Sequence, residues 1–200
     1  MRIGFLTPLP AEYKTFPRSE GKLLNGDQYL VQRCGIGYQA VNTAENLISD
    51  GAELLIGWGV GGSIDPKLKT GDLLISSSIK DQRGGLFEFQ TNFTSILSSA
   101  FLHCLHFQPK HISILSVDQM VLNQEEKKLL FEKYQSPIID MESAIIAQTA
   151  KKSSIPYICV RAVCDEFDTT MPNFLNQILN GYGETNLPAL LRNIIVEPAQ

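Results

Sequence analysis

The sequence predicts one α/β domain, a three-layer sandwich in which helices cover a central sheet that is mixed and mostly parallel. Short apolar runs rich in β-branched residues alternate along the chain with stretches whose apolar residues recur at helical spacing. The length of 200 residues and the 44% hydrophobic content suit one substantial core. No internal repeat or low-complexity tract divides the chain, so we expect residues 1–200 to form a single domain.

Seven apolar runs have the length and composition of strands that are buried on both faces. They are Arg2–Leu6, Tyr29–Cys34, Glu53–Trp58, Asp72–Ser76, His111–Val117, Ile138–Asp140 and Pro156–Val163. Helical periodicity marks Gln39–Ser49, Thr94–Leu105, Gln124–Tyr134 and Ser143–Lys152, with a further stretch near Leu187–Ile195. The least regular stretch is Lys80–Asn92, where Gly84 and Gly85 interrupt a polar run, and we expect a hairpin or a mobile flap there.

Charge and composition argue against two classes of partner. The 17 basic and 21 acidic side chains give a formal net charge of -4, which does not suggest a nucleic-acid groove. The apolar run in the N-terminal stretch MRIGFLTPLP is too short for a signal peptide or a membrane span. We therefore expect a cytoplasmic protein that binds neither nucleic acid nor membrane.

The cysteines and histidines do not form a recognisable metal motif. The four cysteines have no CxxC spacing; they are Cys34, Cys104, Cys159 and Cys164. Most of them lie in or beside apolar runs, so we expect buried, reduced thiols. His103 and His106 flank one cysteine but lack an evident third and fourth ligand. We therefore expect no metal and no cofactor.

Two glycine-rich segments follow predicted strands. Cys34–Ala40 fits the pattern GxGxxA, the local form of a dinucleotide-binding turn, but the acid expected about 20 residues later has no match, because Glu53 opens its strand instead of ending it. A nicotinamide enzyme is therefore a poor alternative. Gly57–Ser63 is expected to be a turn after a strand, either packed against a helix or open to a ligand. Together the two segments favour a crevice for a small ligand at the strand ends.

Asp140 and Glu142 stand where an apolar strand passes into a helix. One acid is explained by capping, since a carboxylate is favoured at the positive end of a helix. A second carboxylate at this point could accept hydrogen bonds from adjacent sugar hydroxyls, because its two oxygens are both acceptors.

Asp165 ends a long buried strand and is followed by further acids at Glu166 and Asp168. Such an acid can simply cap the next element. Alternatively, partial desolvation lets it hold a proton near neutral pH and act as a general acid. Arg161 is the nearest countercharge in the sequence.

With these residues assembled, the chain resembles the superfamily of purine nucleoside phosphorylases and methylthioadenosine/adenosylhomocysteine nucleosidases. The resemblance rests on four motifs in the family's order: Gly35-Ile36-Gly37 with Val41-Asn42-Thr43-Ala44, Gly59–Pro66 with Lys69–Asp72, Asp140-Met141-Glu142, and Arg161–Asp165. Within the superfamily, Ser116-Val117-Asp118, Asp140–Ser143 and Asp165–Asp168 look closest to hopanoid-associated phosphorylases. Futalosine hydrolases usually carry Asn at the Asp165 position, so the sequence disfavours that branch.

The resemblance implies a role for each matched residue. Asp165 would protonate N7 of a purine as its bond to ribose breaks, and Glu12 would activate water. Glu142 would accept hydrogen bonds from the ribose hydroxyls, with Met141 packed against the sugar. The other residues implied in substrate binding are Gly61, Gly62, Met120 and Val121. The resemblance also implies a homodimer or a higher homo-oligomer.

Three positions depart from the family pattern. Gly57 and Val60 stand where bacterial hexameric phosphorylases bring an Arg and a Ser to phosphate, and nucleosidases also often have Ser at the Val60 position. The region of Met120 lacks the aromatic residue that stacks on adenine in nucleosidases. We therefore favour hydrolysis over phosphorolysis, with an adenosine-type purine nucleoside, with or without a 5′ substituent, as the substrate.

Two alternatives stay open. Phosphate remains a possible co-substrate, because Arg33 and Arg83, or the backbone amides of Gly35–Gly37 and Gly61–Ser63, could bind an anion. A nucleoside-binding protein without turnover is the other alternative. The joint presence of Glu12, Glu142 and Asp165 favours the enzyme, because binding alone requires no proton donor at the base.

Overall fold

The structure, a computed structural model, describes residues 1–23, 25–88, 94–99, 102, 108–172, 180 and 184. Its strands are β1 (Arg2–Thr7), β2 (Glu20–Lys22), β3 (Gln28–Arg33), β4 (Leu54–Ser63), β5 (Leu73–Asp81), β6 (Leu86–Glu88), β7 (Lys110–Ser116), β8 (Ile138–Asp140) and β9 (Tyr157–Asp165). Its helices are α1 (Pro10–Tyr13), the 3-10 turn η1 (Gly37–Gln39), α2 (Ala40–Ser49), α4 (Gln124–Tyr134) and α5 (Ser143–Lys152), and residues 94–99 are also helical. All seven expected strands are confirmed.

The strands form one mixed sheet, as the sequence predicts. Five of the nine strand pairings in the described chain are parallel. β4 is the central strand and pairs with β1, β8 and β9. Because β9 also pairs with β5, β5 with β7, and β7 with β8, the strands β4, β9, β5, β7 and β8 close into a ring. The sequence alone does not predict this closure.

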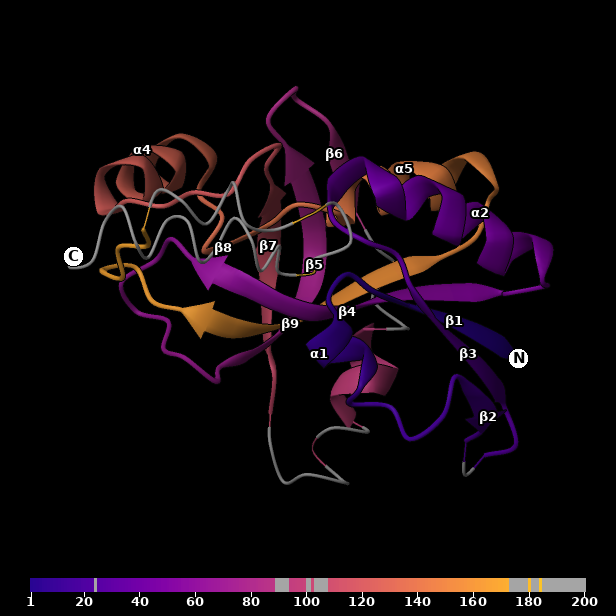
Figure 1. Cartoon of the computed structure of the whole chain (residues 1–200). Coiled ribbons are helices and arrows are strands. Elements are labelled where there is room, and N and C mark those ends of the chain that lie inside the picture. Colours follow the sequence, from indigo (N-terminus) through magenta and orange to yellow (C-terminus); the bar gives the residue numbers. More distant parts are fainter. Residues whose placement is uncertain are drawn as a thin grey trace.

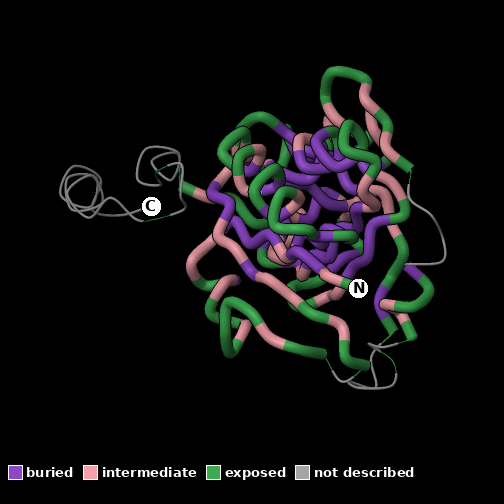
Figure 2. Tube along the Cα trace, turned by 90° about the vertical axis from the view of Figure 1, so that its right-hand side faces the viewer, coloured by how far each residue is buried: buried purple, intermediate pink, exposed green. Residues whose placement is uncertain are grey.

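Helices cover the sheet on two sides. α2 and α5 lie side by side above it, whereas α1 and the helical residues 94–99 lie below it (Figure 1). Ala40, Ala44 and Leu47 of α2 are buried at helical spacing and join the main core cluster. Buried segments gather in the middle of the molecule and exposed ones surround them (Figure 2).

The second glycine segment differs from its prediction. Gly57–Ser63 continues β4 and pairs along β9, so the expected turn is wrong. Its four glycines are not among the residues with positive φ. Their physical role is therefore close approach by neighbouring side chains, not a turn conformation.

Other expectations have mixed outcomes. β5 and β6 confirm a hairpin within Lys80–Asn92, with Gly84 at φ 91° in its turn, although residues 89–92 lie outside the described chain. The short elements α1 and β2 were not predicted. The expected helix near Leu187–Ile195 and the group His103, Cys104 and His106 also lie outside the described residues.

Two kinds of feature are absent from the described part of the chain. None of its helices has the length and apolar character needed to cross a membrane. No group of three or more histidines, cysteines and acids within it could hold a metal ion.

Candidate active site

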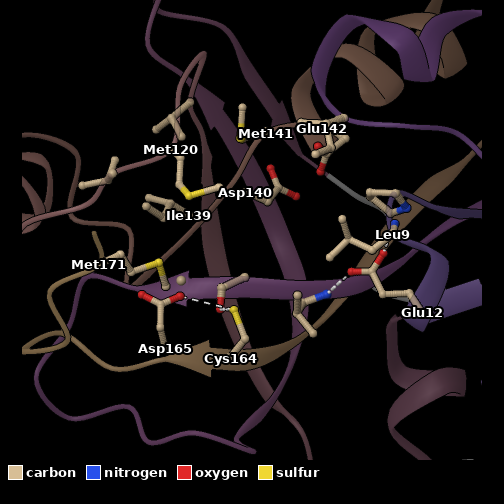
Figure 3. Close-up of a pocket in the computed structure, with 17 residues that line it drawn as sticks. Leu9, Glu12, Met120, Ile139, Asp140, Met141, Glu142, Cys164, Asp165 and Met171 are labelled. Atoms are coloured by element: carbon tan, nitrogen blue, oxygen red, sulfur yellow. Dashed lines mark hydrogen bonds between the residues drawn. The ribbon is translucent and has the colours of Figure 1, made fainter. Parts of the chain in front are cut away.

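A cavity of about 290 Å³ opens where β4, β8 and β9 meet. Figure 3 shows Glu12 and Asp165 on opposite sides of this cavity, with Glu142 on a third side. The cavity is lined by Pro8, Leu9, Glu12, Ile36, Val60, Gly61, Gly62, Val117, Met120, Val121, Ile139, Asp140, Met141, Glu142, Cys164, Asp165 and Met171. The structure thus brings together all eight residues that the sequence analysis selected.

Strand pairing explains how distant residues meet. At the end of β4, Gly62 lies opposite Ile139 of β8 on one side and Asp165 of β9 on the other. The register shifts between Gly61, which pairs with Val163, and Gly62, which leaves Cys164 as the extra residue of a β-bulge. Both Cys164 and Asp165 therefore reach the cavity.

Asp165 is buried, with 8% of its surface exposed, and a lysine ammonium lies on the side away from the cavity. Its Oδ2 accepts a hydrogen bond of 2.7 Å from Nζ of Lys127, a fully buried residue of α4. The expectation that Arg161 is its countercharge is wrong. Arg161 instead pairs with Asp140, because its side chain is directed to the β8 end of the sheet.

The glycines of β4 leave space for the two candidate catalytic carboxylates. A Cβ at Gly62 would lie 2.9 Å from Oδ1 of Asp165. A Cβ at Gly59 would contact Oε1 of Glu12 even more closely. Both sites require glycine because a larger side chain would displace a carboxylate.

Glu12 sits in the short helix α1 and is 6% exposed. Its Oε2 accepts from the backbone N–H of Leu9 at 2.6 Å, and its Oε1 accepts from that of Val60 at 2.8 Å. Burial raises the pKa of Glu12 above its usual range, although Arg161 opposes the rise. A carboxylate with a raised pKa is better suited to take a proton from water.

The sequence suggested helix capping and sugar binding for Asp140 and Glu142, and their contacts differ accordingly. Asp140 accepts from both the backbone N–H and the hydroxyl of Ser143, at the start of α5, and from Nε and Nη2 of Arg161 at 3.0 and 2.8 Å. Glu142 Oε1 accepts from the backbone N–H of Gly37 at 3.0 Å. Burial, followed by the charge of Asp140, raises the pKa of Glu142 to about 8. Both acids line the cavity, but the carboxylate of Asp140 is bound by Ser143 and Arg161 and thereby caps the helix.

Known proteins resemble this chain in sequence. The model of the family described as the phosphorylase superfamily matches residues 4–181. The chain belongs to this superfamily. A 5′-methylthioadenosine/S-adenosylhomocysteine nucleosidase of Buchnera aphidicola is 30% identical over 166 residues, which cover 74% of this chain and 71% of that protein. An aminodeoxyfutalosine nucleosidase of Helicobacter pylori is 25% identical over 151 residues, covering 68% and 66%.

Solved structures share the fold. A Helicobacter pylori 5′-methylthioadenosine/S-adenosylhomocysteine nucleosidase superposes with a TM-score of 0.76 at 20% identity and 98% coverage of both chains. The futalosine hydrolase of the same organism has a TM-score of 0.73 at 21% identity, covering 84% of this chain and 86% of its own. The placement nearest to hopanoid-associated phosphorylases, and the exclusion of the futalosine branch, stay predictions.

Sulfur atoms dominate one side of this phosphorylase-superfamily cavity. Met120, Met141 and Met171 all line it, and they are three of the four methionines in the chain. No aromatic side chain lines the cavity within the described residues. Thioethers are flexible and polarisable and make favourable contacts with aromatic rings. A flat base would thus pack here against methionines.

Cys164 corrects the expectation that the thiols are buried. It is exposed, whereas Cys34 and Cys159 are buried. Its Sγ lies 3.2 Å from Oδ1 of Asp165 and 3.4 Å from the carbonyl oxygen of Gly61. Although the residue is exposed, its Sγ is partly buried, and this burial, followed by the charge of Asp165, raises the pKa of Cys164 to about 12. The thiol is therefore a weak hydrogen-bond donor and not a nucleophile.

The groups considered for phosphate or dinucleotide binding are already engaged. The backbone N–H of Gly37 donates to Glu142, and Gly61–Ser63 is a strand and not an open anion-binding turn. Arg33 pairs with Glu184 and Arg83 with Asp118, and neither arginine lines the cavity. Glu53 accepts from the backbone N–H of Arg2 at the other end of the sheet, which argues against nicotinamide binding.

Sequence reasoning missed Lys127. Lys127 lies in a polar stretch of the sequence, but it shares helical spacing with Leu130, Phe131 and Tyr134, which pack against a core cluster. That spacing is the signal that could have placed it on the inner face of α4.

Proposed function

We propose that this protein hydrolyses the N-glycosidic bond of adenosine-type purine nucleosides. The charge of the cavity supports water over phosphate as the nucleophile. Within the described residues, the charged side chains that line it are all acids, namely Glu12, Asp140, Glu142 and Asp165, and no Lys, Arg or His joins them. Phosphate binding generally relies on cationic donors, and the described lining has no cationic side chain.

Asp165 is the proposed general acid. As the bond between C1′ of ribose and N9 of the purine breaks, its electron pair moves to the base. Asp165, which is ion-paired with Lys127 in the free protein, takes up a proton from solvent when the nucleoside is bound. This proton passes to N7, so that the base leaves neutral and Asp165 returns to a carboxylate. The position of Asp165 at the end of β9, near Met171 and Met120, supports this role, because we propose that these methionines contact the base (Figure 3).

Glu12 is the proposed base for water. It lies across the cavity from Asp165, so a nucleoside between them would have its C1′ within reach of a water held by Glu12 (Figure 3). The water proton moves to Glu12 while its oxygen bonds to C1′. Raising the pKa of Glu12 by burial supports this transfer.

Glu142 and Met141 are the proposed ribose contacts. The second oxygen of Glu142 lies 3.9 Å from Nη2 of Arg161, leaving acceptor positions for sugar hydroxyls. Leu9, which binds Glu12 through its N–H, lines the cavity together with its neighbour Pro8. Ile36, which precedes the Gly37 that binds Glu142, lines it as well. An apolar 5′ substituent, such as an alkylthio group, fits this wall better than a hydroxyl.

Product analysis tests the proposal. Purified protein is incubated with 5′-methylthioadenosine, adenosine and inosine in phosphate-free buffer and again with phosphate. We expect free base and free pentose without phosphate, with 5′-methylthioadenosine as the best substrate. Strict phosphate dependence with formation of a pentose 1-phosphate would establish phosphorolysis, and tight binding without turnover would establish a binding protein. Asp118→Asn, an exposed acid paired with Arg83 outside the cavity, is the matched control for variants of the site acids.

We also propose a homodimer, as the family resemblance implies. Tyr38 is 78% exposed and adjoins Gly37, whose N–H holds Glu142. Tyrosine is enriched in protein–protein interfaces relative to the rest of the surface, so Tyr38 is a candidate interface residue. Light scattering of the intact protein checks the mass, and Tyr38→Ser is expected to shift it toward the monomer.

A further inference from the structure

Lys127 is the most unusual charged residue outside the lining of the cavity. Its side chain has no exposed surface, although it belongs to a helix whose neighbouring residues Glu126 and Lys128 are exposed. All three of its ammonium hydrogens have acceptors: Oδ2 of Asp165 at 2.7 Å, the carbonyl oxygen of Glu166 at 2.6 Å and that of Thr169 at 3.2 Å. The ammonium thus lies directly behind the proposed acid.

Stability alone does not account for such a group. Taking an ammonium and a carboxylate out of water costs about as much free energy as their mutual attraction returns, and an apolar pair of the same volume is often as stable. A buried lysine paired with a carboxylate on a cavity wall is therefore a candidate for a functional role.

We propose that Lys127 is a positioning residue that acts through Asp165, an inference that rests on the proposed function. Its bond to Oδ2 fixes the carboxyl group so that Oδ1 is the oxygen presented to the base. When the proton of Asp165 passes to N7, the carboxylate that remains is stabilised by the ammonium, which keeps its own three protons. No further reactant is needed, and Lys127 never contacts the substrate.

The same ammonium also binds the segment that leads to Met171, one of the methionines proposed to contact the base. Glu166 and Thr169 form a turn, in which the N–H of Thr169 donates to the carbonyl of Glu166 at 3.1 Å. The chain then reaches Met171, whose N–H donates to the carbonyl of Leu122 at 2.8 Å. Lys127 thereby connects α4, Asp165 and the residues leading to Met171. These contacts hold Asp165 and Met171 in a fixed position relative to each other.

A double-mutant cycle tests this role in the intact protein. Lys127→Met keeps the side-chain length without the charge, and its matched control is Lys128→Met, because Lys128 is the exposed next residue of the same helix. We expect Lys127→Met to lower kcat for 5′-methylthioadenosine about 10²-fold, the lower end of the range for general acid catalysis. KM should change only a few-fold, and Lys128→Met should resemble the wild type. Lys127→Arg, which keeps a cation and its donors, should recover part of kcat.

The cycle separates the proposal from a general packing role. If Lys127 acts through Asp165, adding Lys127→Met to Asp165→Asn lowers kcat no further, whereas independent effects would multiply. A 7-deaza analogue of the substrate, which cannot accept a proton at position 7, should bind wild type and Lys127→Met within a few-fold. Multiplying losses, or a parallel loss of analogue binding in both Lys127→Met and Lys127→Arg, would overturn the positioning role. Absence of turnover in the wild type would instead refute the proposed function.

Discussion

Gly62 lies directly beneath the carboxylate of Asp165, so that a Cβ at residue 62 would come within 2.9 Å of Oδ1 and 3.2 Å of Oδ2. Real Cβ atoms do not approach a carboxylate so closely, because the contact is shorter than the sum of the van der Waals radii. The pairing of Gly62 with Asp165 across β4 and β9 leaves the backbone little room to move away. The side chain of Asp165 must therefore shift if residue 62 is enlarged.

Gly62→Ala is expected to reduce kcat about 10²-fold, the cost of roughly 1 Å of misplacement of a catalytic group. The protein should still fold, because alanine is compatible with a strand. Steady-state kinetics and circular dichroism check the two parts. In an Asp165→Asn background the same substitution should have little further effect on kcat, and a second full loss there would show that Gly62 acts elsewhere.

Asp165→Asn should lower turnover by ~10²–10⁴-fold while nucleoside binding persists, because the amide still forms hydrogen bonds but has no carboxylic proton to give. The structure adds a stability effect that the sequence did not suggest. The substitution leaves the Lys127 ammonium buried without its counterion, which costs about 3–5 kcal/mol. Urea unfolding should therefore show Asp165→Asn to be less stable than Asp165→Asn combined with Lys127→Met. Equal stability of the two variants would contradict a buried ion pair.

Much of the fold was accessible from the sequence because its strands are continuous apolar runs and its helices have clear periodicity. The run Arg2–Leu6 and the run Pro156–Val163 became β1 and β9 with small changes at the ends. The predicted strand Glu53–Trp58 ends earlier than β4, because the glycines within Gly57–Ser63 suggest a turn when the sequence is considered alone. Only the partner strands show that each missing Cβ makes room for a side chain from another element.

The site was accessible to the extent that its residues lie at strand ends. Glu142 and Asp165 were found this way, and the structure places both on one cavity. The partner of Asp165 was not found, because Lys127 comes from a helix that is distant in sequence and polar in composition. Proximity in sequence selected Arg161, which the closed ring of strands directs to Asp140 instead.

Glu12→Gln should suppress hydrolysis about 10²-fold or more, because an amide cannot accept the proton of water. A phosphate-dependent reaction would be affected much less, because phosphate needs no base. Glutamine also has only one acceptor oxygen, whereas the glutamate receives the N–H groups of both Leu9 and Val60. We therefore expect a loss of about 1–3 kcal/mol in unfolding free energy from the unsatisfied donor. Assays are made well below the melting temperature so that the two effects separate.

Glu142 makes the stability of the free protein depend on pH. Its pKa is about 8 in the folded state, raised first by burial and second by the charge of Asp140, against an ordinary value of 4.5. Between these two values the folded protein holds a proton that the unfolded chain has released. Stability from this group is therefore complete below pH 4.5 and is lost as the pH rises through about 8.

Glu142→Gln removes this dependence, so the free energy of unfolding of the wild type relative to the variant should fall as the pH rises from 5 to 8, by up to about 1.4 kcal/mol per pH unit. Glu12 contributes in the same direction in both proteins, and the comparison cancels it. Urea unfolding at pH 5, 6.5 and 8 measures the difference, with Glu125→Gln on the exposed face of α4 as the control that should parallel the wild type. A wild-type curve that stays parallel to that of Glu142→Gln would show that Glu142 is ionised in the folded state throughout, because the charge of Arg161 then outweighs burial and Asp140.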